Sequence, residues 1–154
     1  MNDPHVAKMM GFVAGCGDAK MLRQIAENAE AKGVPELAQA ARRKLYSILP
    51  GEDPGTIEYA VWQSIFALED VLKQERGKTI RLSRTRQKIG RQGVVRCVAD
   101  LVVGPASEGF RMLLERDMLE LSFEAIALQF PDEFEPGVLA AARQRLVDAG
   151  YPPP

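Results

Sequence analysis

Apolar side chains recur every three or four residues along most of the chain, which is the spacing of one face of an α-helix. Between residues 18 and 49 this pattern predicts two helices that form a hairpin. Asp18 is suited to cap the first helix, Gly33 to end it, and Pro35 to occupy the first turn of the second. The inward positions of the pair are Met21, Leu22, Ile25, Ala26, Ala29, Leu37, Ala38, Ala41, Leu45 and Ile48. Residues 51–55, Gly-Glu-Asp-Pro-Gly, then predict a loop.

The longest periodic run, residues 56–75, predicts the central helix of the fold. Thr56 is suited to cap it, and Gly77 is placed to end it in the left-handed conformation. Its apolar stripe is wider than one neighbouring helix covers, so we expect it to pack against more than one helix. The stripe consists of Ile57, Ala60, Val61, Trp62, Ile65, Phe66, Leu68, Val71 and Leu72.

Residues 76–103 predict a basic arm followed by two helices. The arm spans residues 76–82, and Ser83 is placed to cap a short helix from Arg84 to Ile89 that ends at Gly90 or Gly93. The next apolar positions, in residues 94–102, fit a buried helix. Their β-branched side chains favour a strand, but no partner strand is apparent elsewhere in the sequence, so we expect a helix.

Residues 107–150 predict the C-terminal helices. Ser107 is suited to cap a helix that ends near Arg116, a second run extends from Met118 to Phe130, and Pro136 opens the last helix. Residues 1–17 are rich in glycine and predict a poorly defined N-terminal segment with at most a short helix, and residues 152–154 predict a proline tail. The sequence therefore predicts an all-α protein with a single compact domain of about seven helices over residues 18–151.

Length and composition are those of an ordinary globular protein. A chain of 154 residues, 46% of them hydrophobic, can form a core without a disulfide or a metal ion. No apolar run approaches the ~20 residues of a membrane span, and the start of the chain lacks the pattern of a signal peptide. We expect a cytoplasmic protein that does not bind membranes. Cys16 and Cys97 lie far apart and His5 is the sole histidine, so we expect buried thiols and neither a metal site nor a cofactor.

The distribution of charge changes this picture. Residues 76–96 contain eight Lys or Arg and no acidic residue, which gives +8, whereas the whole chain has a net charge of -1. The rest of the chain therefore has a net charge of -9. Such a concentration of one sign predicts a surface for a polyanion, and the alternative is that acidic helices of the same protein neutralise it.

The sequence offers no convincing catalytic constellation. Gly11, Gly15, Gly17 and Lys20 lie close together, but no Gly-Lys-Ser/Thr sequence follows a strand as a phosphate loop requires. The acidic pairs are adjacent in sequence, so their side chains diverge by about 100° on a helix and do not share a site. We therefore expect a protein that is not an enzyme.

The basic segment fits the helix-turn-helix motif poorly. If Gly90 is the turn glycine, Arg91 falls at the position that the motif buries. If Gly93 is the turn glycine, the polar Gln92 stands directly before it, where an apolar residue is expected. The sequence therefore predicts an atypical, helix-turn-helix-like basic segment.

The function predicted from these residues is nucleic-acid binding in a regulatory or accessory role, with DNA favoured over RNA. On a helix, Arg84, Lys88 and Arg91 share one face, with Arg86 and Gln87 beside it. Arginine and lysine contact phosphates, whereas Thr85 and Gln87 have groups that hydrogen-bond to base edges. The full predicted set is Arg76, Lys78, Arg81, Arg84, Thr85, Arg86, Gln87, Lys88 and Arg91. The alternative is a non-catalytic interaction module in which the same strip binds an acidic protein, including a second copy of the chain.

Overall fold

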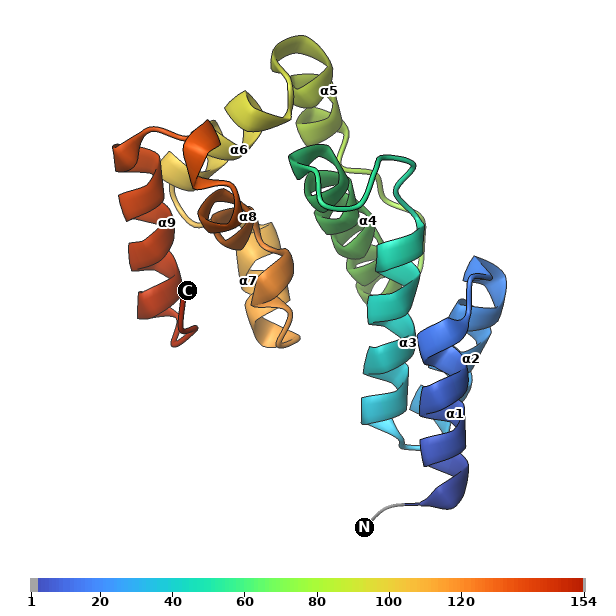
Figure 1. Cartoon of the computed structure of the whole chain (residues 1–154). Helices are drawn as coiled ribbons and strands as arrows, with labels where there is room; N and C mark the ends of the chain where they lie inside the picture. The colour runs from blue at the N-terminus through green and yellow to red at the C-terminus, as the bar shows by residue number, and fades with distance from the viewer. Residues whose placement is uncertain (1–2, 154) are drawn as a thin grey trace. The chain divides into compact units, whose positions relative to one another are not determined.

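The computed structural model describes residues 3–153, and all regular structure in this part of the chain is helical. It contains nine α-helices, α1 to α9, and two short 3-10 helices, η1 and η2 (Figure 1). The predicted all-α class is confirmed. The helices pack into two compact units, residues 1–51 and residues 52–154. The boundary between the units coincides with the loop predicted at residues 51–55.

The first unit contains α1 (Pro4–Gly15), α2 (Ala19–Ala31) and α3 (Pro35–Ile48). Helices α2 and α3 form the predicted hairpin, and α1 packs against α3. The Asp18 carboxylate accepts a hydrogen bond from the Met21 N–H at 3.2 Å, as expected of a cap. Arg42 on α3 pairs with Glu30 on α2 at 2.9 Å, which adds a polar tie to the apolar contact between the two helices.

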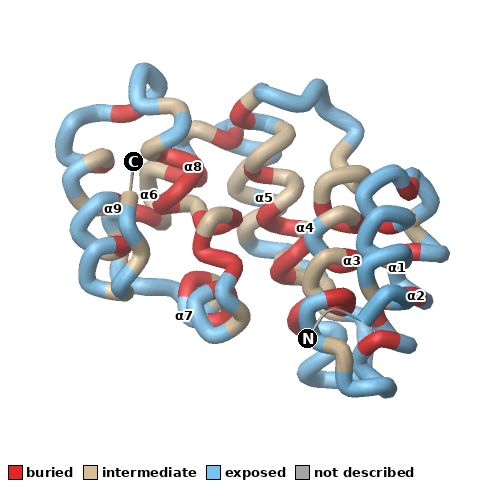
Figure 2. Tube along the Cα trace, turned by 60° about the horizontal axis from the view of Figure 1, so that its bottom comes forward, coloured by how far each residue is buried: buried red, intermediate tan, exposed pale blue. Residues whose placement is uncertain are grey.

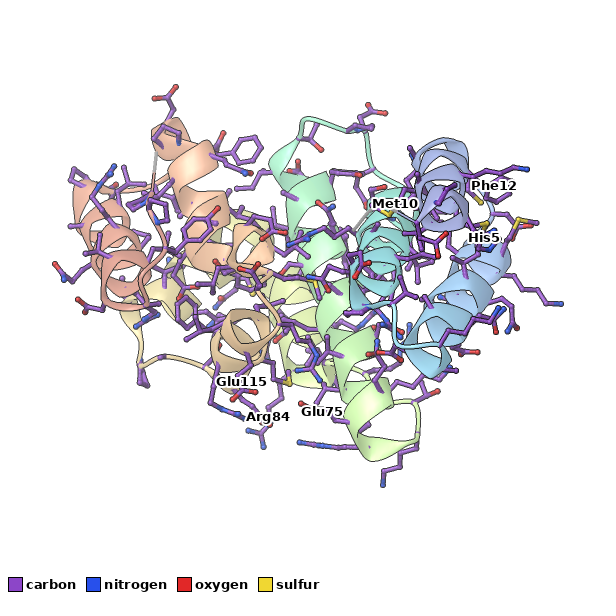
Figure 3. All side chains as sticks on the ribbon, turned by 90° about the horizontal axis from the view of Figure 1, so that it is seen from below. His5, Met10, Phe12, Glu75, Arg84 and Glu115 are labelled. Atoms are coloured by element: carbon purple, nitrogen blue, oxygen red, sulfur yellow. The ribbon has the colours of Figure 1, made fainter. Side chains whose placement is uncertain are left out.

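Helix α1, with 12 residues, corrects the prediction of a poorly defined segment with at most a short helix over residues 3–17, whereas residues 1–2 of that segment lie outside the described residues. Asp3 caps this helix, since its side chain accepts from the His5 N–H at 2.8 Å, and Pro4 occupies the first turn. The sequence prediction gave too much weight to the glycines within the helix and overlooked this start signal. The side chains of Met10 and Phe12 on α1 are both exposed, at 37% and 49% (Figure 3).

The second unit begins with α4 (Ile57–Arg76), α5 (Ser83–Gln92) and α6 (Val94–Val103). It continues with α7 (Glu108–Glu115), η1 (Leu119–Leu121), α8 (Phe123–Gln129), η2 (Pro131–Glu133) and α9 (Pro136–Asp148). The predicted caps Thr56 and Ser107 accept hydrogen bonds from the N–H groups of Tyr59 and Phe110. Gly77 ends α4 in the left-handed conformation, with φ +71°.

The core of this unit lies between α4, α6, α8 and α9. Helix α8 is short but contacts α4, α6 and α9, and most of its length is buried (Figure 2). Ile65 of α4, Val98 of α6 and Ile126 of α8 are among the core residues with 1% exposure or less. The apolar stripe of α4 therefore faces several neighbours, as its width predicted. Cys97 is also buried in α6 and is not in a disulfide.

The helical run predicted from Met118 to Phe130 is interrupted. Ser122 separates η1 from α8, because its hydroxyl donates to the Leu119 carbonyl at 2.7 Å and accepts from the Ala125 N–H at 3.1 Å. The apolar spacing alone did not reveal this buried cap. At the other end, residues 151–153 follow α9 without regular structure, and Pro154 of the predicted tail lies outside the described residues.

One residue, Gly93, joins α5 to α6. This connection is shorter than the three- or four-residue turn of a helix-turn-helix motif, and Gly90 lies inside α5. The backbone of Gly93 has φ +85° and ψ 168°, a region that is open almost exclusively to glycine.

Two alanine substitutions test which glycine makes the turn. We expect Gly93→Ala to lower the free energy of unfolding by about 1–2 kcal/mol, because alanine is strained at this φ and ψ. Gly90→Ala is the matched control and should raise it by about 0.5–1 kcal/mol, since alanine favours a helix interior and its Cβ has open space. Urea denaturation of the two variants measures both effects, and equal changes would show that the two positions do not differ in this way.

Candidate functional site

The basic segment is attached to the second unit through Glu69 on α4. The Glu69 carboxylate accepts from the Leu82 N–H at 2.8 Å and from Nε and Nη2 of Arg86 at 2.8 and 2.7 Å. Helix α5 therefore begins at Ser83 with its preceding residue bound to α4. This corrects the predicted cap, since Ser83 is the first helical residue and Leu82, whose side chain cannot form a hydrogen bond, occupies the cap position. We call Glu69, Leu82 and Arg86 the Glu69 anchor.

The anchor is largely shielded from water. The side chains of Glu69 and Arg86 are 14% and 22% exposed, and the Arg86 guanidinium lies over the rings of Trp62 and Phe66, at 5.1 and 5.8 Å from their centres. Burial raises the pKa of Glu69, but the hydrogen bonds from Arg86 and Leu82 together with the charges of Arg86 and Arg81 outweigh burial and hold that pKa below its ordinary value. The pair is therefore a fixed part of the fold.

A second carboxylate, Asp100 on α6, binds Lys88 of α5. The Lys88 Nζ lies 2.8 Å from Asp100 Oδ2, and Arg96 Nε lies 3.3 Å from Oδ1 of the same residue. The hydrogen bond from Lys88 is the main cause that lowers the pKa of Asp100. At the end of α4, Arg76 pairs with Glu108 of α7 at 3.4 Å, and both side chains are about half exposed. Four of the eight cations of the segment thus have carboxylate partners within the protein.

The other four cations have no carboxylate within ion-pair distance among the described residues. They are Lys78 and Arg81 in the arm and Arg84 and Arg91 on α5, and all four are exposed. Arg84, Gln87 and Arg91 are spaced by three and four residues, so they lie along one exposed face of α5. Figure 3 shows Arg84 at the edge of the molecule, beyond the ribbon. We call Lys78, Arg81, Arg84, Gln87 and Arg91 the free basic face.

The predicted set of site residues therefore divides in two. Lys88 does not lie on the face of Arg84 and Arg91, because it turns to Asp100 instead. Thr85 is half-buried and lines a cavity below α5. The sequence prediction missed the acidic partners Glu69, Asp100 and Glu108. No local signal could have identified Glu69 as the partner of Arg86, since 17 residues separate them.

The free basic face carries positive charge that is suited to an anion. Residues 3–153 hold no group of three or more His, Cys, Asp or Glu side chains placed to bind a metal ion. Within the same range, no helix combines the length and the apolar character needed to cross a membrane. Comparison of the chain with protein-family models, with curated proteins and with solved structures gives no match.

Proposed function

We propose that the protein binds nucleic acid, and DNA in preference to RNA, through the free basic face. The observation that supports this proposal is that four exposed cations without carboxylate partners are gathered on the arm and on one side of α5. Their mutual repulsion is a local cost that an anionic partner relieves. The other cations of the segment hold this surface in place.

The form of the surface favours duplex DNA. Helix α5 contacts α6 and the Glu69 anchor on one side and has no buried residue, so its opposite side is open. The major groove of B-DNA admits an α-helix, whereas that of A-form RNA is too deep and narrow for side chains to read. In such a complex Lys78, Arg81, Arg84 and Arg91 contact phosphates, and Gln87 is positioned for a base edge, ideally of adenine.

The salt dependence of binding tests the proposal. If four phosphates are neutralised, log affinity falls against log salt with a slope of about -3.6, which lowers the affinity about 10²-fold between about 50 and 200 mM salt. Fluorescence anisotropy with a labelled duplex, its single strand and an RNA duplex of the same sequence measures this slope. We expect the DNA duplex to bind most tightly.

Two outcomes contradict the proposal. A flat salt dependence would show that phosphates are not the ligand. A protein that binds none of the three nucleic acids but forms a dimer that dissociates with salt in light scattering would assign the face to an acidic protein surface, here a second copy of the chain.

A further inference from the structure

A cavity of about 460 Å³ lies within the second unit, next to the start of α5. Its volume falls in the range of small-molecule sites in proteins. The walls come from α4, the arm, α5, α6, α7 and the start of α8. Most of the lining is apolar, with Leu68, Leu82, Leu101, Phe110, Leu113 and Phe123.

One polar atom in this cavity has an unmet hydrogen bond. Ser64 of α4 lines the cavity and is fully buried, and its Oγ is the one buried side-chain nitrogen or oxygen without a partner in residues 3–153. Buried polar groups are nearly always hydrogen-bonded, so a ligand with an oxygen at this point of the cavity would complete the hydrogen bonding of the Ser64 hydroxyl. Ser122, which also lines the cavity, provides the contrast because its hydroxyl both donates and accepts within the protein.

The charges around the cavity select for an anion. Arg84 lines it and has no carboxylate partner. The two acidic residues of the lining are already engaged, Glu124 with Arg145 at 2.6 Å and Glu108 with Arg76 and Arg111 at 3.4 and 3.6 Å. Arg84 is therefore the one lining residue whose charge is not balanced within the protein.

We infer that this cavity is a binding site for a small amphipathic carboxylic acid that has an additional hydroxyl or carbonyl oxygen. The apolar body fills the space between Leu68, Phe110 and Leu113, the carboxylate pairs with Arg84, and the second oxygen hydrogen-bonds to Ser64. Acids of this class include hydroxylated and oxidised medium-chain fatty acids. The assignment does not depend on nucleic-acid binding, and its assay contains no nucleic acid, so either proposal can fail without the other.

Isothermal titration calorimetry of the full chain tests the site with 3-hydroxydecanoate, decanoate and decanol as probes. The hydroxy acid should bind more tightly than decanoate, and decanol, which lacks the charge, should bind most weakly. We expect Arg84→Gln to weaken both acids about tenfold, and Ser64→Ala to weaken the hydroxy acid about fivefold without affecting decanoate. Lys73→Gln is the matched control for charge, because Lys73 is exposed on α4 and does not line the cavity.

Both test variants should fold. Arg84 is exposed, and Ser64→Ala removes an unmet buried hydroxyl, so its melting temperature without ligand should equal or exceed that of the wild type. Absence of binding by both acids, or binding that neither Arg84→Gln nor Ser64→Ala changes, would overturn the assignment. So would a loss on Arg84→Gln with no effect of Ser64→Ala on the hydroxy acid, since the proposed contact with Ser64 would then be absent.

Discussion

Replacement of Arg81, Arg84 and Arg91 by glutamine is expected to lower the affinity for duplex DNA on the order of 10²-fold in about 0.1 M salt. The three side chains are exposed and have no ion-pair partner, so their removal leaves the fold unchanged. Each lost phosphate contact also removes about 0.9 from the salt slope, which should change from about -3.6 to about -0.9. Fluorescence anisotropy over a series of salt concentrations measures both quantities.

The control for this prediction has the same change in net charge. Lys20, Arg23 and Lys32 are exposed on and just after α2, and the triple change to glutamine removes three positive charges from the first unit. We expect it to keep the wild-type slope. If both triple variants lose affinity to the same extent, net charge governs binding and the free basic face is not the site. Circular dichroism establishes that both variants retain their helices.

The second large effect is expected at the Glu69 anchor. Glu69→Gln should lower the free energy of unfolding by about 2–3 kcal/mol, because it leaves the shielded Arg86 guanidinium without its charged partner. The control is Glu115→Gln, whose carboxylate pairs with Arg111 on the exposed surface, and this change should cost less than about 0.5 kcal/mol. Urea denaturation at neutral pH compares the two variants.

A double-mutant cycle measures the coupling energy between Glu69 and Arg86 and distinguishes it from the separate effect of replacing each residue. Arg86→Met removes the cation and retains an apolar side chain over Trp62, so the double variant with Glu69→Gln should be no less stable than Glu69→Gln alone. Additive losses would contradict a direct coupling between the two residues.

The same anchor makes stability depend on pH in the acid range. The pKa of Glu69 is lower in the folded protein than its ordinary value of 4.5, so the folded state binds this proton less readily than the unfolded state. The contribution of Glu69 is therefore complete above pH 4.5 and is lost as the pH falls through its lower folded value. The difference in stability between the wild type and Glu69→Gln should shrink below pH 4.5, while Asp100 contributes equally to both proteins and cancels.

The sequence predicted the features that depend on neighbouring residues. The apolar spacing located α2, α3, α4 and α6, and the capping residues Asp18, Thr56 and Ser107 make the expected hydrogen bonds. The left-handed Gly77 also lies where the pattern placed it. These features follow from steric and hydrogen-bonding preferences over four or five residues, which a single sequence displays directly.

The features that the sequence did not predict depend on contacts between distant residues. The packing of α5 determines that Lys88 pairs with Asp100 and that Arg86 pairs with Glu69. Helical spacing shows which residues share a face of α5, but it does not show whether that face points to the protein or to solvent. The same holds for the cavity, since its walls come from six segments spread from Ser64 to Glu124. The prediction that Arg84, Lys88 and Arg91 share one face considered α5 without its neighbours. In the structure, acidic residues of the neighbouring helices bind the Arg86 and Lys88 side chains on the inner side of α5.

The single-residue joint at Gly93 has a consequence for how the orientation of α5 is determined. With one residue between α5 and α6, the angle between the two helix axes depends on two torsions, and glycine is the residue for which these torsions meet the least steric resistance. The orientation of α5 therefore depends on contacts outside the joint: the Lys88–Asp100 ion pair binds α5 to α6, and at the opposite end of α5 the Glu69 carboxylate binds Leu82 and Arg86. Helix α5 is thus held at both ends by carboxylates of neighbouring helices, Glu69 of α4 and Asp100 of α6.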